Sequence, residues 1–220
     1  MRDINQTVIN FDSDKNFKNE DFFLSKSNKH VFEYLKNWPK WEKNFVNIVG
    51  EELSGKSHLV NIFLKKNKGF KIDAKNLKDE DLKKIKTYEN IVIENLTSHI
   101  NEKLFYSLLN IIEQDNKYII VTSINSIVSI NYDLKDLVSR AKSFILLNIE
   151  KPDDELIFAI ILKNLSDRQI TLENKFIDYI IKRIERSYKR IYDFIYKIDQ
   201  LSLKKKKSID FKIIKEVLGE

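Results

Sequence analysis

The sequence lacks cysteine altogether and contains only two prolines and four glycines in 220 residues. The absence of cysteine excludes a disulfide framework and a thiolate metal site. No stretch approaches the roughly 18 consecutive apolar residues that a membrane-spanning helix requires, so we expect no membrane span. The histidines are scattered and lack the spacing of metal ligands. They are His30, His58 and His99.

The residues that are present are typical of a globular protein, with 42% hydrophobic and 33% charged side chains. The N-terminal sequence lacks the apolar core of a secretory signal, which predicts a cytoplasmic protein. The net charge of +6 comes from lysines spread along the chain. Their dense run at 204–207 is expected to be a solvated loop between two helices, with a DNA contact as the alternative.

Two of the four glycines fall in one short segment, GEELSGKS at residues 50–57, which fits the phosphate-loop pattern G-x-x-x-x-G-K-[ST]. An apolar β-like run precedes it and a helical pattern follows it, as a loop that binds phosphates with its amides requires. In this pattern Lys56 reaches the β- and γ-phosphates and Ser57 binds Mg²⁺. Leu53 stands where many such loops carry another glycine, which predicts a stiffer loop or a different approach to the phosphates.

Short apolar runs alternate with helical patterns in the first two thirds of the chain. The β-like runs are FVNIV, GFKID, ENIVIEN, KYIIVTS and SFILLNI. This alternation predicts an α/β fold with a parallel sheet covered on both faces. The helical patterns predict one helix at 28–37, with Asn28 as its cap, and another at 101–115. The second helix is expected to bury Leu104, Leu108, Ile111 and Ile112.

Pro152 marks the expected boundary between two domains. After it the apolar spacing is helical throughout, which predicts a small all-α domain at residues 152–220. The nucleotide-binding α/β domain is expected at residues 21–151. Residues 1–20 are polar and lack helical periodicity, which predicts a flexible tail.

Polar residues at the ends of two predicted strands are candidates for the chemistry of hydrolysis. Glu94 closes an apolar run and is the expected Walker B acid, which holds Mg²⁺ or its water. Asn95 stands where many such ATPases carry a second acid, and an amide cannot act as a base, so we expect little hydrolysis. Thr122 and Ser123 end another run, at a position suited to sensing a γ-phosphate.

Only six of the 39 basic residues are arginines, so arginine is expected where a planar, bidentate cation is needed. Arg140 lies at the end of a predicted short helix, just before the fifth β-like run. Three others are predicted to share one face of a C-terminal helix, with ion pairs to Glu185 or Asp193 as the alternative. These are Arg183, Arg186 and Arg190.

The order and the sequences of these motifs resemble those of the DnaA/Hda family of AAA+ proteins. Within that family the sequence is most similar to the short, DnaA-related regulators of the Hda type, in their alphaproteobacterial form. The segments that carry the resemblance, which spans roughly residues 20–218, are NWPKWEKNFVNIVG, DLKDLVSR, PDDELIFAIILKNLSDRQ and IERSYKRIYDFIYKID. The segment EDFFLSKSNKHVFEYL resembles the part of the family that packs near the adenine.

The resemblance implies an AAA+ domain followed by a helical lid, with ATP or ADP and Mg²⁺ as ligands. The residues implied to bind the nucleotide are Gly50, Ser54, Gly55, Lys56, Ser57, His58 and Arg186, with Mg²⁺ on Ser57 and Glu94. Those implied to act as sensors are Thr122, Ser123, Lys189 and Arg190. Arg140 matches the arginine finger that reaches the nucleotide of a neighbouring subunit.

The resemblance also gives the tail and the whole chain an expected role. Gln6, Ile9 and Phe11 in QTVINF resemble the hexamers that dock on the sliding clamp, the beta subunit of DNA polymerase III. The implied function is to promote, together with the clamp, ATP hydrolysis by DnaA and so limit replication initiation. DNA contact would be indirect through the clamp, and self-association is compatible with the family. The alternatives are an autonomous DNA-associated ATPase of the helicase-loader or transposition-helper type, and a clamp-binding scaffold that binds no nucleotide.

Overall fold

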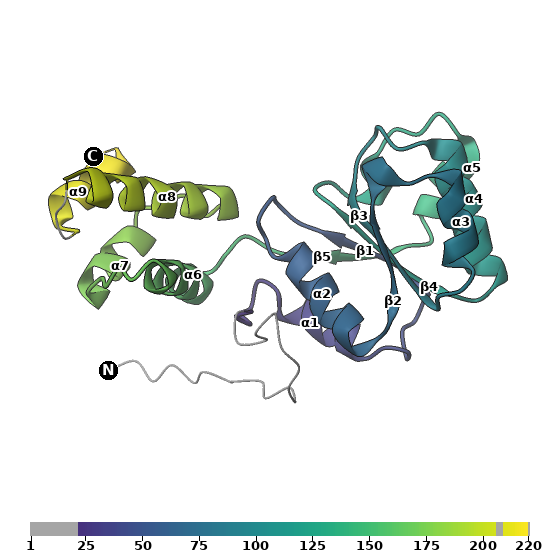
Figure 1. The fold of residues 1–220 in the computed structure, drawn as a ribbon, viewed down its shortest axis with the longest axis horizontal. Coiled ribbons are helices and arrows are strands. Elements are labelled where there is room, and N and C mark those ends of the chain that lie inside the picture. The colour runs from purple at the N-terminus through teal and green to yellow at the C-terminus, as the bar shows by residue number, and fades with distance from the viewer. Residues whose placement is uncertain (1–21, 206–208, 220) are drawn as a thin grey trace.

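The computed structural model describes residues 22–205 and 209–219. The expected clamp-binding residues Gln6, Ile9 and Phe11 lie outside this part of the chain. A five-stranded parallel sheet with the strand order β2-β3-β4-β1-β5 confirms the expected fold class (Figure 1). Its strands are β1 (Phe45–Val49), β2 (Gly69–Asp73), β3 (Asn90–Leu96), β4 (Tyr118–Ser123) and β5 (Ile145–Asn148).

Helices cover both faces of the sheet, as the unbroken apolar runs of its strands require. One face packs against α1 (Lys29–Lys36) and α2 (Lys56–Lys66), and the other against α3 (Asp79–Ile85), α4 (Glu102–Gln114) and α5 (Lys135–Ala141). Because successive strand residues point to opposite faces, Ile91 and Ile93 pack with the second group, whereas Val92 packs with α1 and α2. The face of the sheet to which a strand side chain points therefore determines which helices it packs against.

Asn28 is the N-cap residue of α1, as expected, but its side chain does not bond the first turn of the helix. Its side-chain amide instead holds the preceding segment: Oδ1 accepts from the Ser25 amide at 3.0 Å and Nδ2 donates to the Phe23 carbonyl at 3.0 Å. One detail of the second expected helix was wrong. In α4, Ile111 is only partly buried, because the helix directs Phe105 and Leu109 into the core instead.

After β5 the described chain is helical and forms a core of its own (Figure 1). Its helices are α6 (Asp154–Asp167), α7 (Asn174–Ile181), α8 (Tyr188–Lys205) and α9 (Phe211–Leu218). Among the described residues, no helix is long and apolar enough to cross a membrane. The boundary at Pro152 remains a prediction.

The prediction that Arg183, Arg186 and Arg190 share a helix face was wrong. Arg183 and Arg186 lie in the turn between α7 and α8, and only Arg190 is helical. The reason is that Ile184 packs in the lid core, whereas Tyr188 packs in the core around β1 and α2. Residues four apart on one helix share a face, so a continuous helix would not direct these two side chains into separate cores.

A single buried asparagine connects the sheet to the loop beyond β4. Asn47 of β1 is fully buried, and its Nδ2 donates to the Val121 carbonyl at 3.1 Å and to Ser123 Oγ at 2.9 Å. Its Oδ1 accepts from the Ile127 amide at 2.9 Å. These bonds fix the end of β4 beside the end of β1, where the phosphate loop begins.

Asn47→Leu should lower the free energy of unfolding by about 2–4 kcal/mol, because it leaves buried polar groups without partners. Urea denaturation followed by circular dichroism measures the change. The matched control is Asn44→Leu, just before the same strand, where the lost bond to Asn116 is exposed and less than about 1 kcal/mol is expected. Equal losses in the two variants would contradict the assigned role of Asn47.

Candidate nucleotide-binding site

The loop at residues 50–55 joins β1 to α2 in a conformation that its two glycines permit. Gly55 has φ +92°, in the left-handed region, and a Cβ on it would lie 3.1 Å from a ring carbon of Phe22. A Cβ on Gly50 would lie 2.7 Å from Ser54 Oγ. Leu53 also has a left-handed φ, +65°, which costs a residue with a Cβ about 1–2 kcal/mol. The loop thus places a leucine in the backbone conformation that glycine normally supplies.

Lys56 is folded back into the loop. Its Nζ donates to the carbonyl oxygens of Gly50 and Glu51, each at 2.6 Å. Burial lowers the pKa of Lys56, and the nearby carboxylates of Glu52 and Glu51 oppose that shift. The ammonium therefore lies inside the curve of the loop, where a phosphate would be bound.

Two serines and a histidine line the same turn. Ser54 is buried, and its Oγ has no hydrogen-bond partner among the described residues. Ser57 lies exposed in the first turn of α2. The ring of His58 packs against Phe22, with ring centroids 5.2 Å apart. The unsatisfied Ser54 hydroxyl and the exposed Ser57 hydroxyl are donors suited to phosphate oxygens.

Glu94 does not end its strand, because β3 continues past a register shift to Leu96. Its Oε2 forms an ion pair with Lys71 of β2 at 3.1 Å, and its Oε1 is buried without a hydrogen-bond partner among the described residues. Asn95 has φ +57° and donates from Nδ2 to Asp73 at 2.7 Å. Sequence reasoning missed Lys71, which nothing in the phosphate-loop pattern identifies.

The two hydroxyls predicted to be sensors are both buried. Thr122 Oγ1 accepts from the Asn95 amide at 3.1 Å, so it joins the ends of β3 and β4. Ser123 Oγ accepts from Asn47. The structure therefore ties Thr122 to the residue after the predicted Walker B acid and Ser123 to Asn47, and both belong to the framework that shapes the end of the sheet.

The donor set near the loop fits Mg²⁺ only in part. In the described portion of the chain, no group of three or more histidine, aspartate or glutamate side chains gathers to hold a metal. Ser57 Oγ and the unpartnered Oε1 of Glu94 remain as donors. Mg²⁺ usually takes one or two protein oxygens and completes its shell with phosphates and water. These two groups would therefore hold it together with a nucleotide.

The lid reaches the loop through its helix α8. Glu51 Oε2 accepts from the Tyr188 amide at 3.1 Å, and Lys189 Nζ lies 3.7 Å from Glu52 Oε2. The Tyr188 hydroxyl donates to the Glu150 carbonyl at 3.0 Å, and burial, followed by nearby carboxylates, raises its pKa. Sequence reasoning missed Glu51 and Tyr188, although two adjacent acids inside a phosphate loop were a visible signal.

The remaining predicted arginines are paired within the chain. Arg186 contacts Asp154 of α6 at 2.6 Å, and Arg190 contacts Glu185 at 3.1 Å, as the ion-pair alternative expected for it. The structure thus brings Lys189 to the loop and gives Arg186 and Arg190 acidic partners elsewhere.

Arg140 lies on the opposite face of the sheet from α2. It lies in the last turn of α5, where its guanidinium contacts Glu113 and donates to Asn110 Oδ1 at 3.0 Å, both on α4. Since α4 and α5 cover the face away from α2, Arg140 lies away from its own phosphate loop.

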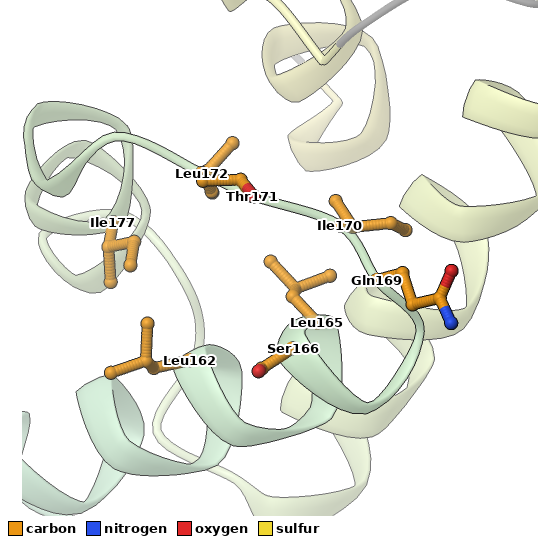
Figure 2. A pocket seen from close by; sticks show the side chains of 8 residues that line it. All are labelled: Leu162, Leu165, Ser166, Gln169, Ile170, Thr171, Leu172 and Ile177. Atoms are coloured by element: carbon orange, nitrogen blue, oxygen red, sulfur yellow. The ribbon is translucent and has the colours of Figure 1, made fainter.

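The lid contains a separate pocket, lined by α6, by the segment leading into α7 and by Ile177 of α7 (Figure 2). Its lining is largely aliphatic, and its polar members are Ser166, Gln169 and Thr171. No charged side chain lines it, which makes it unsuited to phosphates.

Comparisons with known proteins bear on the lid and on the fold. Residues 153–218 match the family model described as the lid domain of Hda. Domain III of the Thermotoga maritima replication initiation protein DnaA has a TM-score of 0.71 at 19% identity, covering 91% of this chain and 94% of that one. AMPPCP-bound DnaA from Aquifex aeolicus has a TM-score of 0.64 at 21% identity, covering 82% of this chain and 64% of the other.

The Thermotoga maritima RuvB Holliday junction branch migration motor has a TM-score of 0.67 at 16% identity, covering 91% and 70% of the two chains. At these identities the likenesses establish the shared AAA+ fold. No curated protein sequence matches the chain.

Leu53→Gly should raise the free energy of unfolding by up to about 1 kcal/mol, because relief of the left-handed strain exceeds the extra freedom of glycine in the unfolded chain. Urea denaturation measures it. The control is Leu162→Gly, at a similarly exposed leucine within α6, which should lose about 1 kcal/mol. A loss at Leu53 equal to that at Leu162 would show that the loop is unstrained.

Proposed function

We propose that this chain, a DnaA/Hda-type AAA+ protein by its lid sequence and its fold, is a regulator of replication initiation that binds an adenine nucleotide. The observation that carries the proposal is the loop at residues 50–57, with the Lys56 ammonium held inside its curve and the lid contacting it through α8. A DnaA of the same fold is described as bound to AMPPCP, which supports ATP or ADP as the ligand. When present, Mg²⁺ would be held by Ser57 and Glu94 and would neutralise negative charge on the phosphates.

The nucleotide's role in the chain itself is conformational. Glu51 and Glu52 connect the loop to the first turn of α8, so a phosphate entering the loop acts on both domains. Turnover of the nucleotide is expected to be slow, because the side-chain amide of Asn95 cannot serve as a base and already donates to Asp73. A nucleotide that stays bound would hold the lid in one orientation.

The chain's catalytic contribution is to a partner, DnaA. Arg140 would serve as a finger in trans that stabilises charge on the phosphoryl group being transferred. Its partner Glu113 is about half exposed. Arg140 can therefore leave Glu113 for a phosphate at little cost, because water solvates the Glu113 carboxylate that is left behind. In the proposal, residues 6–11 anchor the chain on the DNA-loaded sliding clamp and so raise its effective concentration beside DnaA.

Arg140→Ala should reduce stimulation of DnaA's ATP hydrolysis by about 10³-fold or more, the usual contribution of an arginine finger. The measurement is single-turnover hydrolysis by ATP-loaded DnaA in the presence of this chain and the DNA-loaded clamp. The control is Arg168→Ala, which breaks a similar pair with Asp199 inside the lid and should leave stimulation unchanged.

Binding of the Arg140→Ala variant to the clamp should be intact, whereas Gln6→Ala should weaken it. Full stimulation by Arg140→Ala would refute the finger assignment. Rapid ATP hydrolysis by the chain alone or with bare DNA would favour an autonomous DNA-associated ATPase of the helicase-loader or transposition-helper type.

A further inference from the structure

We infer that Lys71 is a built-in cation beside Glu94, so that this chain binds its adenine nucleotide without needing Mg²⁺. The inference rests on the proposed nucleotide binding and specifies which form of the ligand the site takes. It comes from a lysine that lies where β2, β3 and α2 meet.

Lys71 connects the predicted Walker B acid to the helix that follows the phosphate loop. Its Nζ lies 3.1 Å from Glu94 Oε2 and donates to Asn61 Oδ1 of α2 at 2.8 Å. Asn61 lies four residues after Ser57, so both are on one side of α2, a turn apart. In P-loop proteins the metal lies between the loop's serine or threonine and the Walker B acid. The lysine thus bridges the two elements that Mg²⁺ would bridge.

The strand register explains why this contact forms. Lys71 pairs with Val92 in the sheet, and Val92 faces α2, so Lys71 points to the same side. Glu94, two residues after Val92, points there too. A lysine at position 71 and an acid at position 94 are therefore placed on one face of neighbouring strands, the face that α2 packs against, with Lys71 exposed on the edge strand β2.

Charge decides what the contact does. The Glu94 side chain is only 13% exposed, and a carboxylate so placed is costly without a counterion. Lys71 supplies that counterion within the protein, so Glu94 does not add an uncompensated negative charge near bound phosphates. When Mg²⁺ is removed, the Lys71 ammonium still supplies a positive charge beside Glu94.

The same pairing bears on hydrolysis. A Glu94 whose Oε2 is held by Lys71 has one oxygen left to orient a metal ion or its water. Lys71 is thus a positioning residue that favours retention of a nucleotide over its turnover. This is the behaviour expected of a chain whose nucleotide sets a conformation.

Isothermal titration with ADP, in MgCl₂ and again in EDTA, tests the inference. For the unaltered chain the Kd should differ less than about threefold between the two conditions. For Lys71→Met it should be at least about tenfold weaker in EDTA and recover in MgCl₂, a change of about 1.4 kcal/mol. The control is Lys68→Met, an exposed lysine just before β2, which should behave like the unaltered chain.

Two further variants separate charge from folding. Lys71→Arg should retain metal-free binding, and Glu94→Gln added to Lys71→Met should restore it, because the repelling charge is gone. Thermal melting of each variant shows whether it is folded. Loss of binding in Lys71→Met that neither MgCl₂ nor Glu94→Gln repairs would make Lys71 merely structural and overturn the inference.

The outcomes also distinguish this inference from the proposed function. ADP binding that is lost in Lys56→Ala, but that weakens tenfold or more in EDTA for the unaltered chain, contradicts only the role of Lys71. Absence of ADP binding by the unaltered chain in both conditions overturns the proposed nucleotide binding and the inference with it.

Discussion

One hydrogen bond, from the Tyr188 amide to the Glu51 carboxylate, joins the lid directly to the phosphate loop. A free amide at the start of a helix attracts negative charge, and here the phosphate loop supplies it from its own sequence. The bond lies at the first residue of α8 and holds the start of this helix against the loop. The Tyr188 ring packs in the core around α2. The loop is therefore positioned by β1 on one side and by the lid on the other, so its conformation and the lid's orientation are linked.

This linkage explains why the phosphate loop contains two acidic residues. Glu51 and Glu52 add negative charge where phosphates would bind, which is unfavourable unless those charges are engaged elsewhere. The lid engages both, through the Tyr188 amide and Lys189. Lys71 does the same for Glu94. Carboxylates near the loop are thus compensated by groups of the chain, which suits a protein that keeps a nucleotide as a structural element.

The sequence predicted the sheet, the loop and the lid because each follows from local patterns: apolar runs, scarce glycines placed together, and helical spacing after Pro152. It did not predict the break before α8, because residues 184, 188 and 191 have the spacing of one helix face. Only packing reveals that Ile184 and Tyr188 enter different cores. Likewise, the pairing of Lys71 with Glu94 requires the register of β2 against β3, which a single sequence does not encode in any local pattern.

The central claim is that the loop and the lid form one adenine-nucleotide site. Amide hydrogen exchange of the full chain, with and without saturating ADP, tests it most directly because exchange reports the opening of individual segments. The account predicts slower exchange both in residues 50–60 and in residues 186–192 at the start of α8. Slowing confined to the loop, or no slowing in either segment, would contradict it.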